Sequence, residues 1–155
     1  MRLSHCHNFQ DFRTLAKKRL PGPIFNYIDG GADDEVTYRQ NTSTFDRCDL
    51  LPSVLTGVED VDMSVTVMGQ KLDMPIYCSP TALQRLFHHQ GERAVAAAAE
   101  KYGTMFGVSS LGTVSLEEMR QKHKTPQVYQ FYFHRDRGLN KAMMQRAKEA
   151  GVDVM

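Results

Sequence analysis

The sequence lacks the features that mark membrane proteins, secreted proteins and nucleic-acid-binding proteins. Its 155 residues contain no apolar run that approaches the roughly 20 residues of a membrane-spanning helix. The 19 Lys and Arg residues are scattered and balanced by 18 Asp and Glu residues, which argues against a nucleic-acid surface. The first seven residues have no apolar core of the kind that a signal peptide needs. We therefore expect a cytoplasmic protein.

Cysteines are few and show no paired spacing. The three, Cys6, Cys48 and Cys78, are an odd number, which fits free thiols in a reducing compartment. The tract His5-Cys6-His7 resembles a metal-binding sequence, but no second pair of ligands lies near it. We therefore predict neither a disulfide nor a metal site.

What the sequence does contain is a repeat of β/α units. Three apolar runs each end in a polar tip and pass into a helical segment, and a fourth run begins at the end of the chain. Continuous apolar runs are typical of strands buried on both faces, and parallel units bring their strand ends to one common face. In a (β/α)₈ barrel that face carries the active site. The tips are Ser79-Pro80-Thr81-Ala82, Ser109-Ser110 and Gln130-Phe131-Tyr132.

Start and stop signals place the elements of the repeat. Ser115 and Glu118 have the spacing of a capping box, so a helix is predicted to begin at Leu116. The alternation over residues 65–72 around a glycine predicts a small hairpin before the repeat. The other predicted elements are strands at 74–78, 105–108 and 127–133, and helices at 92–102 and 139–150.

The chain divides into two parts in this interpretation. Residues 1–60 form an N-terminal helical segment and loop, in which a helix starts after Asn8 as its N-cap. Residues 61–155 form the entry hairpin and the first three β/α units. A (β/α)₈ barrel needs about 250 residues, so the predicted fold class is α/β, the N-terminal part of a (β/α)₈ barrel that is incomplete in this chain. We expect the chain to be cut at the start of its fourth strand.

Polar side chains within the tips are the candidate binding groups. Gln130 lies inside an apolar run, where a buried amide must find hydrogen-bond partners, and it shares a strand face with Tyr132. An amide and a phenol on one face suggest a heteroaromatic ligand and a small anion. Two plainer interpretations stay open: Gln130 pairs with side chains of the neighbouring strand, and Ser79-Pro80-Thr81-Ala82 is an ordinary turn.

These motifs, in this order, resemble the FMN-dependent α-hydroxy acid dehydrogenases and oxidases, which include glycolate oxidase and bacterial L-lactate dehydrogenase. The resemblance extends from about Phe9 to Met155 and is carried by several separate motifs. They are Tyr27-Ile28-Asp29-Gly30-Gly31-Ala32-Asp33-Asp34-Glu35, the tip from Ser79 to His88, Gly91-Glu92, Ser109-Ser110 and Gln130-Phe131-Tyr132.

The resemblance implies FMN as cofactor and a role for each motif. Pro80, Thr81 and Ala82 would line the flavin, with the Ala82 N–H near its N5 atom. Ser109 and Gln130 would bind the polar edge of the ring, although the stretch after Ser109 departs from a fixed pattern. The substrate would be contacted by Tyr27 and Tyr132.

The resemblance also implies that the catalytic base, a histidine, lies beyond Met155, so that this chain alone would be inactive. The intact enzyme is expected to oxidise a small L-2-hydroxy acid, with L-lactate preferred, and to pass electrons to a quinone or to oxygen. A homo-oligomer is expected, and peripheral association with the inner face of the membrane is an open alternative. The alternative functions are a non-catalytic half-barrel and another flavin barrel, such as a type of isopentenyl diphosphate isomerase. The latter would have glycine-rich phosphate loops, which the sequence does not show.

Overall fold

The computed structural model describes residues 2–155, which divide into two compact units on either side of the boundary between Glu59 and Asp60. No helix of the described residues is long and apolar enough to cross a membrane. The division falls close to the predicted one, whose assignment to an N-terminal segment and a barrel part stays a prediction. Each unit is considered separately.

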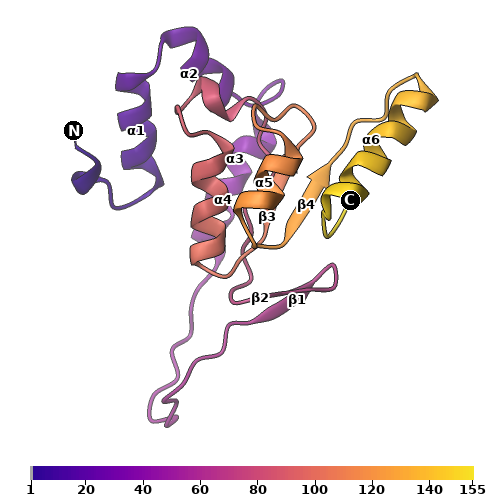
Figure 1. The fold of residues 1–155 in the computed structure, drawn as a ribbon. Helices are drawn as coiled ribbons and strands as arrows, with labels where there is room; N and C mark the ends of the chain where they lie inside the picture. The colour runs from indigo at the N-terminus through magenta and orange to yellow at the C-terminus, as the bar shows by residue number, and fades with distance from the viewer. Residues whose placement is uncertain (1) are drawn as a thin grey trace. The chain divides into compact units, whose positions relative to one another are not determined.

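The first unit consists of short helices joined by loops (Figure 1). Helix α1 begins after Asn8, whose side chain accepts a hydrogen bond from the Asp11 N–H, so the predicted cap is confirmed. A salt bridge between Arg13 of α1 and Asp29 of α2 joins two of the helices, with Nη2 of Arg13 2.9 Å from Oδ2 of Asp29. The helical elements are η1 Leu3–His5, α1 Phe9–Arg19, α2 Gly22–Asp29, α3 Val36–Ser43 and η2 Phe45–Arg47.

The second unit is a run of parallel β/α elements preceded by an antiparallel hairpin, as predicted. Strands β3 and β4 pair in parallel, so that Ser109 lies opposite Gln130. Parallel bridges add Cys78 on one side and Val154 on the other. The elements are β1 Val65–Val67, β2 Gln70–Leu72, η3 Gln84–Leu86, α4 Glu92–Lys101, β3 Phe106–Ser109, α5 Leu116–Lys122, β4 Gln127–Gln130 and α6 Arg137–Ala150.

Two strands are shorter than predicted. The run 74–78 is reduced to a single bridge at Cys78, and β4 ends at Gln130 instead of residue 133. A strand persists only while a neighbour accepts and donates its backbone hydrogen bonds, and the chain leaves β3 after Ser109. Helix α6 begins two residues earlier than predicted because the Asp136 side chain caps it, accepting from the N–H groups of Gly138 and Leu139.

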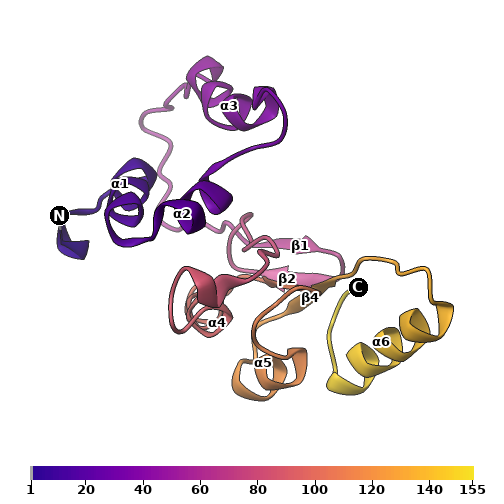
Figure 2. The ribbon, with the colours of Figure 1, turned by 90° about the horizontal axis from the view of Figure 1, so that it is seen from above.

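Helices α4, α5 and α6 lie on one side of the sheet (Figure 2). Phe106, Val108 and Tyr129 face them and are buried, together with Ala96 and Ala99 of α4. Alanines allow the helix backbone to approach the sheet closely, which explains the alanine-rich composition of α4. The chain is the N-terminal part of a (β/α)₈ barrel preceded by a helical segment, and its described strands do not close.

Candidate functional site

The C-terminal ends of the neighbouring parallel strands come together at one end of the sheet. The Ser110 N–H donates to the carbonyl of Gln130 at 3.0 Å, and the Leu83 N–H donates to the carbonyl of Leu111 at 3.1 Å. A Cβ atom on Gly107 would lie 2.5 Å from the backbone nitrogen of Pro80, so only glycine permits this approach. The three polar tips that the sequence predicts therefore lie together at the C-terminal end of the strands.

Gln130 is the last residue of β4 and is half-buried, whereas the sequence predicted a buried amide inside a longer strand. Its Oε1 atom accepts a hydrogen bond from Oγ of Ser109 at 3.3 Å and a longer one from Oγ of Ser110 at 3.5 Å. The hydrogen bonds to Oε1 agree with the plainer interpretation, in which Gln130 pairs with side chains of the neighbouring strand. The Nε2 atom donates to no acceptor within residues 2–155, and it remains a donor for a ligand.

The first tip presents a backbone donor. Oγ1 of Thr81 donates to the carbonyl of Ser79 at 3.5 Å, which is the turn that the plainer interpretation predicts. Leu83 then adopts a left-handed backbone conformation with φ of 55°, which turns the chain away. Among the described residues no acceptor takes the Ala82 N–H, so it too is available to a ligand.

Both candidate substrate-binding tyrosines are largely exposed. Tyr132 follows the end of β4 and is 66% exposed, so strand alternation does not extend to it. Tyr27 lies in α2 of the first unit and is 59% exposed. Contacts of both tyrosines with a substrate stay predictions.

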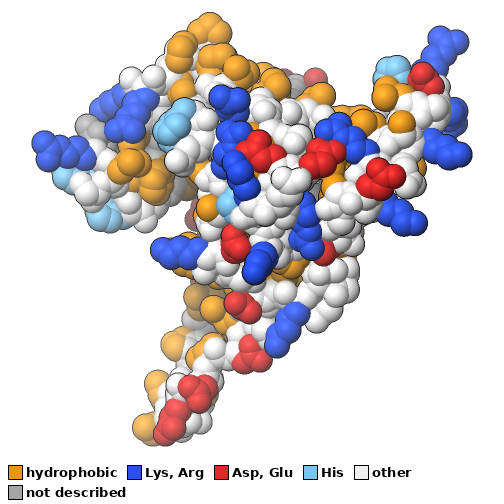
Figure 3. Space-filling model, viewed as in Figure 1, with side chains coloured by type: hydrophobic (Ala, Val, Ile, Leu, Met, Phe, Trp, Pro, Cys, Tyr) orange, Lys and Arg blue, Asp and Glu red, His pale blue; other side chains and the backbone are white. Residues whose placement is uncertain are grey.

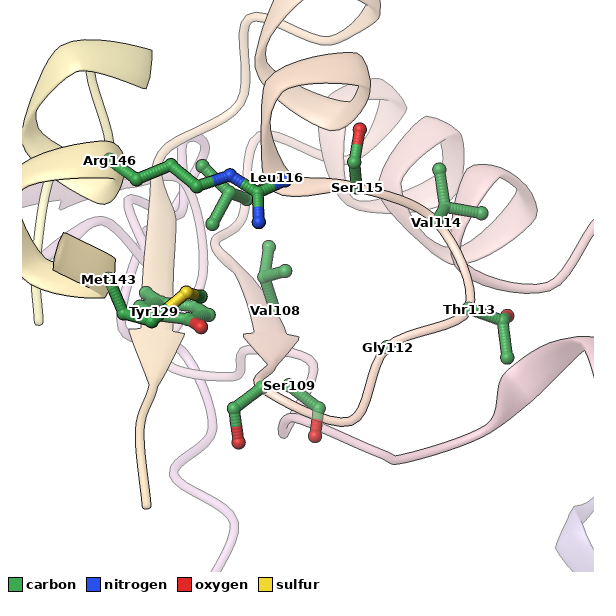
Figure 4. Close-up of a pocket in the computed structure, with 11 residues that line it drawn as sticks. Val108, Ser109, Gly112, Thr113, Val114, Ser115, Leu116, Tyr129, Met143 and Arg146 are labelled. Carbon is green, nitrogen blue, oxygen red and sulfur yellow. The ribbon is translucent and has the colours of Figure 1, made fainter. Parts of the chain in front are cut away.

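A cavity of about 260 Å³ lies on the helix side of the same strands. Figure 4 shows Gly112, Thr113 and Ser115 along the segment that leads from β3 to α5, and Tyr129 beside Met143 on the other side of Val108. Burial raises the pKa of Tyr129, which keeps the phenol neutral, and burial likewise raises the pKa of the Cys78 thiol. The cavity backs onto the buried core, and Gln130 is not among the residues that line it.

His88 lies near the first tip, because it lines a cavity together with Ser79 and Thr81. The rings of His88 and His89 are tilted by 40° to each other with centroids 4.4 Å apart, and both residues are exposed. His123 contacts Glu100 at the surface. No group of three potential metal ligands occurs within residues 2–155.

The sequence interpretation gave no role to Glu92 beyond its motif. The structure buries this carboxylate completely and pairs it with Thr113, on the loop that follows Ser109. The available signal was an acidic residue directly after Gly91, at the start of a helix whose sheet-facing side is otherwise alanine.

Comparison with known proteins adds an independent finding. The sequence profile of the family described as FMN-dependent dehydrogenase matches residues 16–155. Glycolate oxidase 1 of Oryza sativa subsp. indica is 38% identical over 148 residues, which are 96% of this chain and 40% of the relative. L-lactate oxidase of a Nostoc species is 38% identical over 152 residues, 96% of this chain and 42% of the relative. L-lactate dehydrogenase of Vibrio parahaemolyticus is 37% identical over 145 residues, 94% of this chain and 38% of the relative.

Solved structures agree with this likeness. A crystal structure of mandelate oxidase superposes with a TM-score of 0.84 at 33% identity, over 93% of this chain and 43% of the other. An active chimera of (S)-mandelate dehydrogenase gives a TM-score of 0.85 at 32% identity, over 94% and 41%. The chain thus spans about 40% of the length of the relatives that it matches.

Proposed function

Because this chain belongs to the FMN-dependent dehydrogenase family, we propose that it supplies part of the active site of an enzyme that oxidises a small L-2-hydroxy acid to the 2-keto acid. L-lactate is the substrate that we propose first. The named relatives include a glycolate oxidase, an L-lactate oxidase and an L-lactate dehydrogenase at nearly equal identity, which supports the substrate class. Both oxygen and a quinone are candidates for the electron acceptor.

The donor set at the strand ends fits a flavin. The polar edge of the isoalloxazine ring carries carbonyl oxygens and unprotonated nitrogens, which need hydrogen-bond donors, beside one N–H group, which needs an acceptor. The Ala82 N–H and Gln130 Nε2 both lack a protein acceptor within residues 2–155. These free donors are the observation that carries the proposal. Bound FMN would take up the two electrons that leave the substrate carbon.

Each remaining residue has one task in this proposal. Ser109 orients the Gln130 amide through the hydrogen bond to Oε1, and Pro80 and Thr81 line the ring beside Ala82. Tyr132 and Tyr27 contact the substrate, Tyr27 at its carboxylate. We propose that the group that takes the hydroxyl proton lies outside residues 1–155, as the family resemblance implies.

The test is reduction of bound flavin in the full-length protein. The protein is purified and mixed without oxygen with L-lactate, glycolate or mandelate, and the loss of flavin absorbance is followed. The proposal expects a yellow protein that is bleached by at least one of the three, and fastest by L-lactate. A colourless protein that binds no added FMN would instead support the non-catalytic half-barrel. A yellow protein bleached fastest by glycolate or mandelate would reassign the substrate.

A further inference from the structure

Glu92 is an unusual residue in the second unit because its charged side chain is completely buried. It is the first residue of α4, and its exposed fraction is 0%. Burying a carboxylate is costly unless hydrogen bonds replace its water. Here both oxygens are taken by one residue: the Thr113 N–H donates to Oε1 and Thr113 Oγ1 donates to Oε2, each at 2.6 Å.

Thr113 also holds a second loop. Its Oγ1 atom accepts a hydrogen bond from the Arg85 N–H at 3.2 Å, so this hydroxyl both donates and accepts. Two residues earlier, the carbonyl of Leu111 accepts from the Leu83 N–H at 3.1 Å. These hydrogen bonds join the loop after β3, residues 110–115, to the segment that begins with the first strand tip, residues 79–91.

Helix α4 gives these loops a rigid anchor. Ala96 and Ala99 of α4 are buried in the core against the sheet, with exposed fractions of 0% and 1%. Glu92 is therefore fixed by the packing of its helix, whereas residues 110–115 have no regular structure beyond their turns. A hydrogen bond from a packed helix to a loop transmits the position of the helix to that loop.

We propose that Glu92 and Thr113 are positioning residues, which hold the two loops in one arrangement so that the Ala82 N–H and the Gln130 amide oriented by Ser109 face the flavin together. The inference rests on the proposed function for its ligand. The loop coupling itself rests on the four hydrogen bonds alone. Ala82 lies one residue before Leu83, and Ser109 lies two residues before Leu111, so loosening the loops displaces the Ala82 N–H and the serine that orients Gln130.

The first experiment measures hydrogen exchange in the full-length protein for Thr113→Val, which keeps the shape of the side chain and removes its hydroxyl. Exchange in segments 80–90 and 110–116 should accelerate by about tenfold, as expected when a net hydrogen bond is lost. Thr113→Ser keeps the hydroxyl and should restore slow exchange. If segment 80–90 exchanges in Thr113→Val as it does in the wild type, the loops are not coupled and the inference is overturned.

Thr125→Val is the matched control. Oγ1 of the buried Thr125 donates to the carbonyl of Thr104, at the end of the strands away from Gln130. This variant loses a buried hydroxyl of the same kind and should lose stability without accelerating exchange in 80–90 selectively. Selective acceleration in 80–90 in this control would show that the effect is general loosening, and would contradict the proposal.

The second experiment titrates FMN into the apoprotein and separates the two proposals. The dissociation constant should rise about tenfold in Thr113→Val and stay near the wild-type value in Thr113→Ser and Thr125→Val. Wild-type affinity in Thr113→Val would overturn the positioning role while the proposed function stands. If the wild type binds no FMN, the proposed function fails, and the coupling of the loops is decided by the exchange data.

Discussion

Ser109 and Gln130 lie opposite each other at the last paired position of β3 and β4, with Oγ of Ser109 3.3 Å from Oε1 of Gln130. Oγ of Ser109 accepts a hydrogen bond from the Leu111 N–H at 3.1 Å, and its own proton is directed to Oε1 of Gln130. The Nε2 atom is thereby directed away from β3 as a free donor. The serine selects the orientation, and the glutamine makes the contact with a ligand.

Gln130→Leu is expected to weaken the binding of FMN in the full-length protein. The change leaves a polar edge of the ring without its donor, at a cost of about 1–3 kcal/mol. Flavin content after purification and the FMN dissociation constant measure the effect. Gln127→Leu is the matched control, since it removes an amide from the same strand on the face toward the helices, and it should retain normal flavin content. Normal flavin in Gln130→Leu would contradict the assignment.

Gln127→Leu should raise the free energy of unfolding. The Gln127 side chain is completely buried, and neither its Nε2 nor its Oε1 atom has a hydrogen-bond partner among the described residues. An apolar side chain of similar volume removes that desolvation cost, which is about 1–3 kcal/mol for a buried polar group. Urea unfolding measures the change, with the exposed Gln121→Leu for comparison. A loss of stability would mean that an internal water satisfies the amide.

Tyr132→Phe should slow reduction of bound flavin by the hydroxy acid without loss of FMN. Tyr132 is 66% exposed at the strand end, where its phenol can reach a substrate and does not pack in the core. Stopped-flow reduction under anaerobic conditions gives the rate, and absorbance gives the bound flavin. Tyr102→Phe, at the C-terminal end of α4, provides the control. Flavin loss with normal turnover per remaining FMN would place Tyr132 at the cofactor instead.

Glu118 should make folding depend on pH in the acid range. Hydrogen bonds from Arg93, and then from Lys122, lower the pKa of Glu118 from 4.5 to about 2. Because the folded value is the lower one, the stability from these contacts is complete above about pH 4.5 and is lost as the pH falls toward about 2. Glu118→Gln should flatten the unfolding free energy across that window. Urea unfolding at several pH values tests this, and an unchanged slope would contradict it.

Local signals in the sequence predicted the helix starts well. Asn8 and Ser115 each cap a helix as expected, because a cap depends on residues three positions apart in the chain. Strand ends could not be predicted in the same way. Residues 131–133 have strand-like character, yet β4 ends at Gln130 because its neighbour has already turned away.

The burial of the two glutamines shows a second limit of the sequence. The alternation of side chains along a strand predicts that Gln127 and Gln130 point to opposite faces of β4, but it does not predict which face the helices cover. The helices cover the face on which Gln127 lies, so the fully buried amide is that of Gln127, which the sequence interpretation did not single out. Similarly, Glu92 and Thr113 are 21 positions apart, and only the fold brings them together.

Residues 1–155 expressed alone should be prone to aggregate and should not keep FMN. Leu50, Leu51 and Leu55 are each more than nine-tenths exposed, and hydrophobic side chains lie among acidic ones on the segment at the bottom of the view in Figure 3. With this much apolar surface in water, burial offsets the loss of chain entropy poorly. Binding of a hydrophobic dye, near-ultraviolet circular dichroism and flavin absorbance of the purified chain test the expectation. A yellow protein that unfolds cooperatively and is bleached by L-lactate would contradict it, and would require a catalytic base among the histidines that this chain contains.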